Sequence, residues 1–154
     1  MADVTITECD PSSPDAASMA AALWDEVQTR YGFTADDPFD PAAFAGPVGR
    51  FWVARSGTQP VGSIALMPFE DGVAEMDVMY VAPSHRGSGV ARELLDALED
   101  HARRAGIVEV RLRAGDPQPE AMRFYAKSGF TPIPSFGRWV DDPTARCLAR
   151  RIEP

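Results

Sequence analysis

The sequence predicts an α/β (α+β) fold, in which a mixed, mostly antiparallel sheet of six or seven strands carries helices on both faces. Three observations support this fold. Short stretches rich in β-forming residues alternate with turn residues, longer stretches carry apolar residues at helical spacing, and one strand runs directly into a glycine-rich turn and a helix. The chain has 154 residues, 45% of them hydrophobic, so residues 1–154 are expected to form one domain with one substantial core.

The first part of the chain predicts a strand over residues 4–7 and then a long helix. Ser13 is a good helix cap, Pro14 suits the first helical turn, and Gly32 is a typical stop. Between these ends, apolar residues recur on one helical face, namely Met19, Leu23, Val27 and Tyr31. We interpret most of this stripe as core packing.

A meander of strands follows a loop region. Residues 33–51 are rich in proline, glycine and aromatic residues and predict the loop, whereas residues 50–55 and 60–67 predict two strands of a hairpin. A turn at residues 70–72 leads into a further strand over residues 74–81, which continues the antiparallel meander.

The strand over residues 74–81 is followed by a turn and a helix that together predict an anion site. The helix carries a core-facing stripe of Val90, Leu94, Leu95, Leu98 and Ala102. Glycines at a helix N-terminus let a ligand approach unpartnered N–H groups, and the adjacent arginine has a planar donor fork suited to phosphate. We therefore predict that a pyrophosphate is held by the six residues of the turn: Arg86, Gly87, Ser88, Gly89, Val90 and Ala91.

Two common phosphate-binding turns do not match this sequence. A Walker-type loop needs a Lys-Ser/Thr pair after its second glycine, where Val90 and Ala91 stand here. A dinucleotide-binding turn would place a third glycine at position 92, which is Arg92. The preceding strand also carries Glu75 and Asp77, whereas a buried parallel strand is continuously apolar.

The last part of the chain predicts a strand over residues 108–113 and a helix over residues 118–127, ended by Gly129. The turn has the form Arg-x-x-Gly-x-Gly/Ala, and residues 121–130 read Ala-x-x-Phe-Tyr-x-x-x-Gly-Phe. These two motifs, in this order, resemble the signatures of the GNAT acyltransferase superfamily over about residues 50–150. Residues 130–147 are further similar to a bacterial subgroup of small-molecule N-acetyltransferases.

The resemblance implies a GNAT fold with a splayed central strand, with acetyl-CoA as the acyl donor and no metal. In this family the pantetheine arm pairs with the end of the splayed strand, and a tyrosine of the second signature can protonate the leaving thiolate, which implies that role for Tyr125. Further donor contacts are implied for Gln118 and Phe124 and for the strand residues Met79, Tyr80 and Val81. The alternatives are core packing for Phe124 and a structural role for Tyr125.

The alternation in the strand over residues 74–81 places Glu75, Asp77, Met79 and Val81 on one face. Acyl transfer to an amine needs a group that accepts the amine proton. Several GNAT enzymes carry a glutamate base at the position of Glu75, which is the first choice, while Asp77 is a second base or holds a cationic group. The alternative is that both carboxylates are solvated strand residues without a catalytic role. In this family the segment between the first helix and the second strand helps to wall the acceptor pocket, which implies Tyr31, Phe39 and Phe44 as candidate wall residues. The alternative for these three is core or lid packing.

The net charge of −8 disfavours nucleic acid as a partner, since phosphate contacts need clustered Lys and Arg. We expect neither a leader peptide nor a membrane span, and two free thiols in a reducing cytoplasm, Cys9 and Cys147. The subgroup usually carries a cation where this chain has Asp77 and another where it has Met67. The loss of these two cations near the acceptor predicts a cationic or neutral small amine as acceptor. The alternatives are acetylation of a protein N-terminus or lysine, and a non-catalytic acyl-CoA-binding module; a homodimer is possible.

Overall fold

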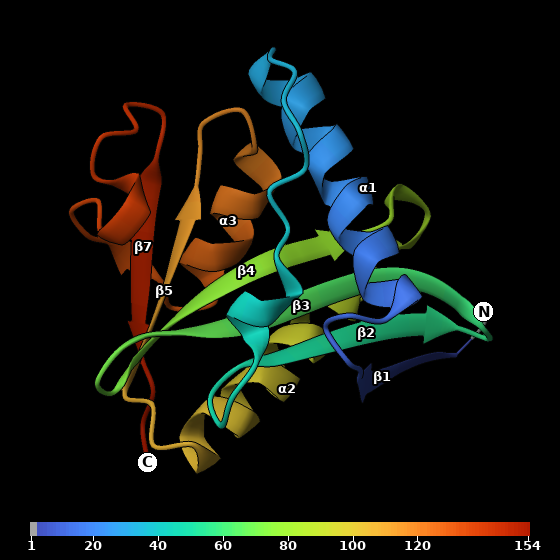
Figure 1. Ribbon diagram of the computed structural model, residues 1–154, viewed down its shortest axis with the longest axis horizontal. Coiled ribbons are helices and arrows are strands. Elements are labelled where there is room, and N and C mark those ends of the chain that lie inside the picture. The colour runs from blue at the N-terminus through green and yellow to red at the C-terminus, as the bar shows by residue number, and fades with distance from the viewer. Residues whose placement is uncertain (1–2) are drawn as a thin grey trace.

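The computed structural model describes residues 3–154 and is built on a seven-stranded sheet with the strand order β1-β2-β3-β4-β5-β7-β6 (Figure 1). All neighbouring strands are antiparallel except β4 and β5, which are parallel. The strands are β1 (Val4–Glu8), β2 (Arg50–Ser56), β3 (Gln59–Glu70), β4 (Val73–Val81), β5 (Glu109–Ala114), β6 (Thr131–Pro132) and β7 (Arg146–Arg151). The mixed, mostly antiparallel sheet that the sequence predicts is therefore confirmed.

The helices cover both faces of the sheet, with α1 on one face and α2 on the other (Figure 1). They are α1 (Pro14–Tyr31), α2 (Val90–Arg104) and α3 (Pro119–Lys127), with short 3₁₀ turns η1 (Pro41–Phe44), η2 (Pro83–His85) and η3 (Gly137–Trp139). Within residues 3–154, no helix has both the length and the apolar character that crossing a bilayer requires.

Helix α1 begins and ends where the sequence predicts. The Ser13 hydroxyl accepts the Ala16 N–H at 3.2 Å, and Gly32 closes the helix in the left-handed region at φ 73°. The stripe packs as core at its N-terminal end, where Met19 is buried and Leu23 packs against the core on this face. At its C-terminal end Val27 and Tyr31 are half-buried and line a cleft, so Val27 corrects the prediction of core packing, whereas Tyr31 lies where a pocket residue is predicted.

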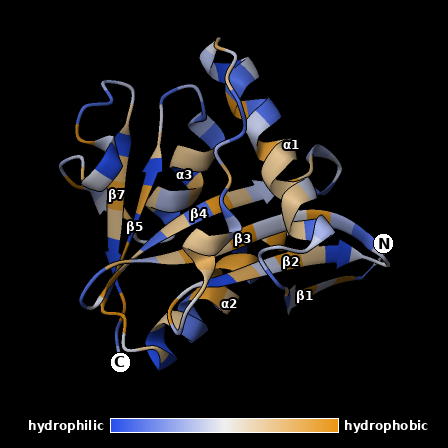
Figure 2. Cartoon of the chain, in the orientation of Figure 1, coloured by the Kyte–Doolittle hydropathy of each residue, from blue (hydrophilic) through white to orange (hydrophobic). Residues whose placement is uncertain are grey.

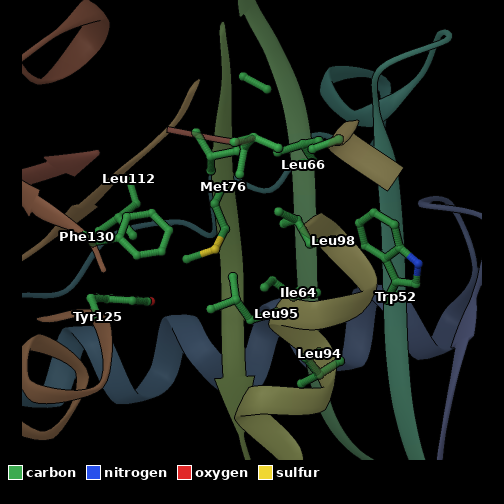
Figure 3. Close-up of a cluster of buried hydrophobic side chains, with 14 of the residues drawn as sticks. Trp52, Ile64, Leu66, Met76, Leu94, Leu95, Leu98, Leu112, Tyr125 and Phe130 are labelled. Atoms are coloured by element: carbon green, nitrogen blue, oxygen red, sulfur yellow. The ribbon is translucent and has the colours of Figure 1, made fainter. Parts of the chain in front are cut away.

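The main core lies between the sheet and α2 (Figures 2 and 3). Leu94, Leu95 and Leu98 have no exposed surface and pack on residues of the central strands such as Ile64 and Met76. Each such leucine contributes roughly 1.5–3 kcal/mol by leaving water. A second core with fewer residues lies between the sheet and α1, where Phe44, Phe51, Val53, Ala65 and Val78 are buried.

Strand β4 contains a bulge that the alternation pattern does not predict. Val78 lies at φ 50°, which is a rare backbone conformation for a β-branched residue, and the pairing with β3 shifts between Asp77 and Tyr80. As a result, Val78 packs in the α1-side core, while Met76 and Met79 both pack in the α2-side core. The predicted common face of Glu75, Asp77, Met79 and Val81 is wrong, because the bulge reverses the phase of the strand.

Strands β4 and β5 are joined over a short stretch only. Their register consists of three pairs, Val73↔Glu109, Ala74↔Val110 and Glu75↔Arg111. Beyond Glu75 the strands diverge, and this is visible as a V between them (Figure 1). The splayed central strand that the resemblance implies is therefore present, and the opening lies at the C-terminal ends of both strands.

Candidate functional site

A cleft of about 1140 Å³ occupies the opening between β4 and β5. It is bordered by α1, by the loop after α1, by α3 and by the start of α2. Every candidate site residue named from the sequence lines this cleft except Ser88. The Ser88 hydroxyl instead donates to the backbone carbonyl of His85.

The glycine-rich turn forms one end of the cleft. Gly87 and Gly89 lie at φ 78° and 91°, where only glycine is unstrained, and Gly89 is the N-cap of α2. No side chain caps this helix, so its first N–H groups remain available to an anion. Arg86 lies beside the turn, where its Nε donates to the Val81 carbonyl at 2.8 Å and its Nη2 pairs with Glu26 of α1 at 2.6 Å.

The bulged end of β4 lies along the cleft, between the glycine-rich turn at one end and the carboxylates of Glu75 and Asp77 at the other. Tyr80 and Val81 pair with Ser63 and Gly62 of β3, and none of the residues from Met79 to Val81 pairs with β5, so one edge of the strand is unpaired here. The bulge is fixed from below, because the buried Ser63 hydroxyl donates to the Val78 carbonyl at 2.7 Å. The Val78 N–H is in turn held by the Asp77 carboxylate at 2.8 Å.

Glu75 and Asp77 lie together and share one arginine. Arg138 Nη2 lies 3.0 Å from Glu75 Oε2 and 2.7 Å from Asp77 Oδ2, and Trp139 Nε1 donates to the same Glu75 oxygen at 3.3 Å. Glu75 is only 4% exposed. Burial raises the pKa of Glu75 above its ordinary value, an effect that Arg138 opposes and the Asp77 charge reinforces.

Tyr125 lines the cleft from α3 and is otherwise enclosed. Its ring packs at 5.7 Å from the rings of both Phe124 and Phe130, and the latter pair is seen in Figure 3. Burial raises the pKa of Tyr125 well above its ordinary value, and the negative charge of Asp77 adds to this effect. The hydroxyl is therefore protonated at neutral pH. The guanidinium of Arg92 lies over the ring of Phe124, 5.5 Å from its centre.

Tyr31 and Gln118, predicted to serve the acceptor side and the donor side respectively, are hydrogen-bonded to each other. The Tyr31 hydroxyl donates to Gln118 Oε1 at 2.9 Å and accepts from Arg113 Nη1 at 2.9 Å. A Cβ at Gly115 would lie 2.0 Å from this hydroxyl, so the close approach of the β5–α3 loop requires a glycine there.

The aromatic candidates of the loop form one wall. Phe44 is buried and packs against Phe39 at 5.7 Å and Phe51 at 6.1 Å between ring centres. Phe39 and Phe44 line the cleft beside Met67, which faces Glu75 across the β3–β4 pairing. This wall therefore lies next to the carboxylates.

Several charged and aromatic residues of the cleft were not identified from the sequence. Arg138 and Trp139 come from η3, and Asp142 follows them in an irregular loop without periodicity. Arg113 pairs with Asp142 at 3.0 Å, and its guanidinium stacks between Tyr31 and Trp139 at 5.0 and 5.5 Å. No pattern in the sequence places these residues beside β4. Among residues 3–154, no group of His, Cys, Asp and Glu side chains is arranged to hold a metal ion.

Comparison with known proteins gives sequence matches over most of the chain. The model of the acetyltransferase (GNAT) family matches residues 17–130. A relative named IAA acetyltransferase from Azospirillum brasilense is 32% identical over 153 residues, which cover 99% of this chain and 100% of that protein. N-acetyltransferase 8F1 of Rattus norvegicus is 37% identical over 87 residues, so that the match covers 53% of this chain and 39% of that protein's length.

Solved structures share the entire fold. An acetyltransferase of the GNAT family from Staphylococcus aureus Mu50 superposes with a TM-score of 0.81 at 20% identity, covering 98% of this chain and 100% of that one. The PaiA N-acetyltransferase from Thermoplasma acidophilum, solved in complex with coenzyme A, has a TM-score of 0.75 at 17% identity, covering 97% and 99% of the two chains. At these identities the likeness shows the fold alone.

Proposed function

Because this chain belongs to the GNAT acetyltransferase family, we propose that it transfers the acetyl group of acetyl-CoA to a primary amine of a small molecule. The amine nitrogen attacks the thioester carbon directly, so that a C–N bond forms, the C–S bond breaks, and the amine loses a proton while the thiolate gains one. One observation carries this proposal: a single cleft joins the uncapped N-terminus of α2 to the buried carboxylate of Glu75.

The residues at the α2 end of the cleft fit acetyl-CoA. Free N–H groups at a helix N-terminus suit a pyrophosphate, and Arg86 can exchange its Glu26 partner for phosphate oxygens. The unpaired edge of β4 from Met79 to Val81 suits an arm that contains amide groups, in the manner of an added strand. When bound, acetyl-CoA would supply an activated thioester, which the residues of the cleft would orient.

Glu75 and Tyr125 are the proposed base and acid. A raised pKa makes the Glu75 carboxylate a stronger base, suited to taking the proton that an amine must lose. Tyr125 lines the cleft from α3 with its hydroxyl protonated at neutral pH, and from this position it can give the proton to the leaving thiolate, although the burial that raises its pKa makes it a weaker acid than a free tyrosine. Asp77 is the second candidate base or the partner of a cationic group, and Tyr31 and Phe44 line the acceptor side.

We further propose that the acceptor is a cationic or neutral amine with an apolar portion. Two arginines that the sequence hypothesis did not count enter this end of the cleft, but each is already paired: Arg113 with Asp142, and Arg138 with two carboxylates. The apolar wall of Phe39 and Phe44 lies beside those carboxylates. A relative whose name is IAA acetyltransferase supports a small molecule rather than a protein as acceptor.

The first experiment is calorimetric titration with acetyl-CoA, with CoA and NADH as controls. Binding of acetyl-CoA but not of NADH supports the donor site, and a screen for thiol release with amines then follows. The screen contains polyamines, aminoglycosides, arylalkylamines, amino acids and peptides with free N-termini. Turnover of small amines supports the proposal, whereas turnover of peptides alone indicates a protein acetyltransferase. Binding without turnover of any amine indicates an acyl-CoA-binding module.

A further inference from the structure

We infer that Arg138 is a positioning residue for the reaction, which holds the Glu75 carboxylate ionised and turned toward the acceptor. The inference rests on the proposed function, in which Glu75 takes the amine proton. Arg138 belongs to η3 in the connection from β6 to β7, more than sixty positions from Glu75 in sequence, and it reaches the cleft because that loop folds back over β4.

The geometry assigns different tasks to the two oxygens of Glu75. Oε2 accepts from Arg138 Nη2 at 3.0 Å and from Trp139 Nε1 at 3.3 Å, which occupies both of its lone pairs. Within residues 3–154, no side chain or backbone group donates to Oε1. The residue lines the cleft, so Oε1 is the atom left to receive the amine proton.

Arg138 is the cation that acts on Glu75. The neighbour of Glu75 on β3 is the uncharged Met67, and its neighbour on β5 is Arg111, whose guanidinium is bonded to Glu109. On its own strand the nearest charge is Asp77, a carboxylate that discourages the ionisation of Glu75. Without Arg138, a buried carboxylate would stand beside a second carboxylate with no cation between them, and Glu75 would hold its proton more tightly.

Arg138 is also held in place while remaining accessible. Its guanidinium lies 4.4 Å from the centre of the Trp139 ring, and a single nitrogen, Nη2, bridges Glu75 and Asp77. The side chain is 50% exposed, so small cations from solution can reach the position that its removal would vacate. This accessibility makes the inference testable by chemical rescue.

The experiment compares Arg138→Gln with Arg138→Lys and with a matched control, Arg146→Gln. Arg146 also has a side chain that is 50% exposed and pairs with one carboxylate, Asp116, but it does not line the cleft. For each protein, kcat/KM is measured with a saturating donor across the pH range. The pH titration of the Glu75 carboxyl carbon is followed by NMR in glutamate-labelled protein, with the signal assigned by its loss in Glu75→Gln.

The expected result for Arg138→Gln is a loss of kcat/KM that is about tenfold larger at low pH than at high pH, because a hydrogen-bonded charge of this kind shifts the ionisation of its partner by about a factor of ten. The Glu75 signal titrates at higher pH than in the native chain. Guanidinium ions restore activity, while sodium chloride at the same ionic strength does not. Arg138→Lys retains part of the activity, and Arg146→Gln has an unchanged profile.

A loss of activity that is equal at all pH values and is not rescued by guanidinium would overturn the inference, as would an unchanged Glu75 titration. The NMR readout needs no turnover. If the native chain acetylates no amine but the Glu75 titration still depends on Arg138, then the proposed function fails while the coupling of the two residues stands.

Discussion

The Ser63 hydroxyl supports the bulge in β4, and its removal tests how the cleft is built. Ser63 is fully buried, and its Oγ donates to the Val78 carbonyl at 2.7 Å. In Ser63→Ala this carbonyl loses its side-chain donor, and a buried acceptor left without a partner costs about 1–3 kcal/mol. In a chain of this length each kcal/mol lowers the melting temperature by about 2–4 °C, so a loss of about 2 kcal/mol lowers it by about 4–8 °C.

Activity is expected to fall together with stability. The bulge at Val78, with φ 50°, lies between the carboxylates of β4 and the donor edge Met79–Val81, and Asp77 is bonded to the Val78 N–H. Misplacement of reacting groups by a fraction of an ångström is costly, so turnover should fall about tenfold or more. Melting is followed by circular dichroism and turnover by thiol release. The control, Ser13→Ala, removes the cap of α1 and costs about 0.5–2 kcal/mol without touching the bulge, so turnover per folded molecule should be unchanged. A Ser63→Ala protein that melts within about 1 °C of the native chain and turns over normally would refute this account of the bulge.

Three further predictions concern the carboxylate and the glycine turn. Glu75→Gln should bind acetyl-CoA within about twofold of the native affinity by calorimetry, yet lose about 10²–10⁴-fold in turnover, since the amide cannot accept the amine proton; normal turnover would exclude Glu75 as the base. The folded state raises the pKa of Glu75 above its ordinary 4.5 and so binds the proton more tightly than the unfolded chain. The free energy of unfolding relative to Glu75→Gln, from urea titrations, should therefore decrease as the pH rises above 4.5 and level off above the folded pKa; an increase would contradict the raised pKa. Gly89→Ala places a Cβ at φ 91° and should cost about 1–2 kcal/mol in stability and weaken acetyl-CoA binding. The control, Gly57→Ala at φ 63° in the β2–β3 hairpin, should lower only the stability. Equal affinity for acetyl-CoA in both variants would argue against the turn as the anion site.

Local signals predicted most of the architecture. The Ser13 cap and the Gly32 stop of α1, the hairpin of β2 and β3, and the glycine turn before α2 depend on residues close together in sequence, and each lies where the sequence indicates. The two-residue β6 and the strand β7 were not located from the sequence, since β7 (Arg146–Arg151) is rich in arginine and has no clear alternation.

The remaining features of the site depend on contacts between distant segments. Alternation assumes a regular strand, so it gave the wrong face for Met79 once the bulge at Val78 reversed the phase. Arg138 and Trp139 lie in an irregular loop whose path is decided by how β6 pairs with β7. For the same reason, counting the cations near the acceptor from the sequence omitted Arg113 and Arg138, which tertiary packing brings to the carboxylates.

The three-pair junction of β4 and β5 has a mechanical consequence. Strands β1–β4 form one half of the sheet and β5–β7 form the other, and backbone hydrogen bonds join the two halves only over the three β4–β5 pairs at one end of the opening. A molecule that lies in the opening contacts both halves and adds a second connection far from these pairs. Binding should therefore reduce the motion of one half of the sheet relative to the other. Amide hydrogen exchange at Met79–Val81 and Leu112–Ala114, the free edges of the opening, should slow more on donor binding than exchange in the β2–β3 hairpin.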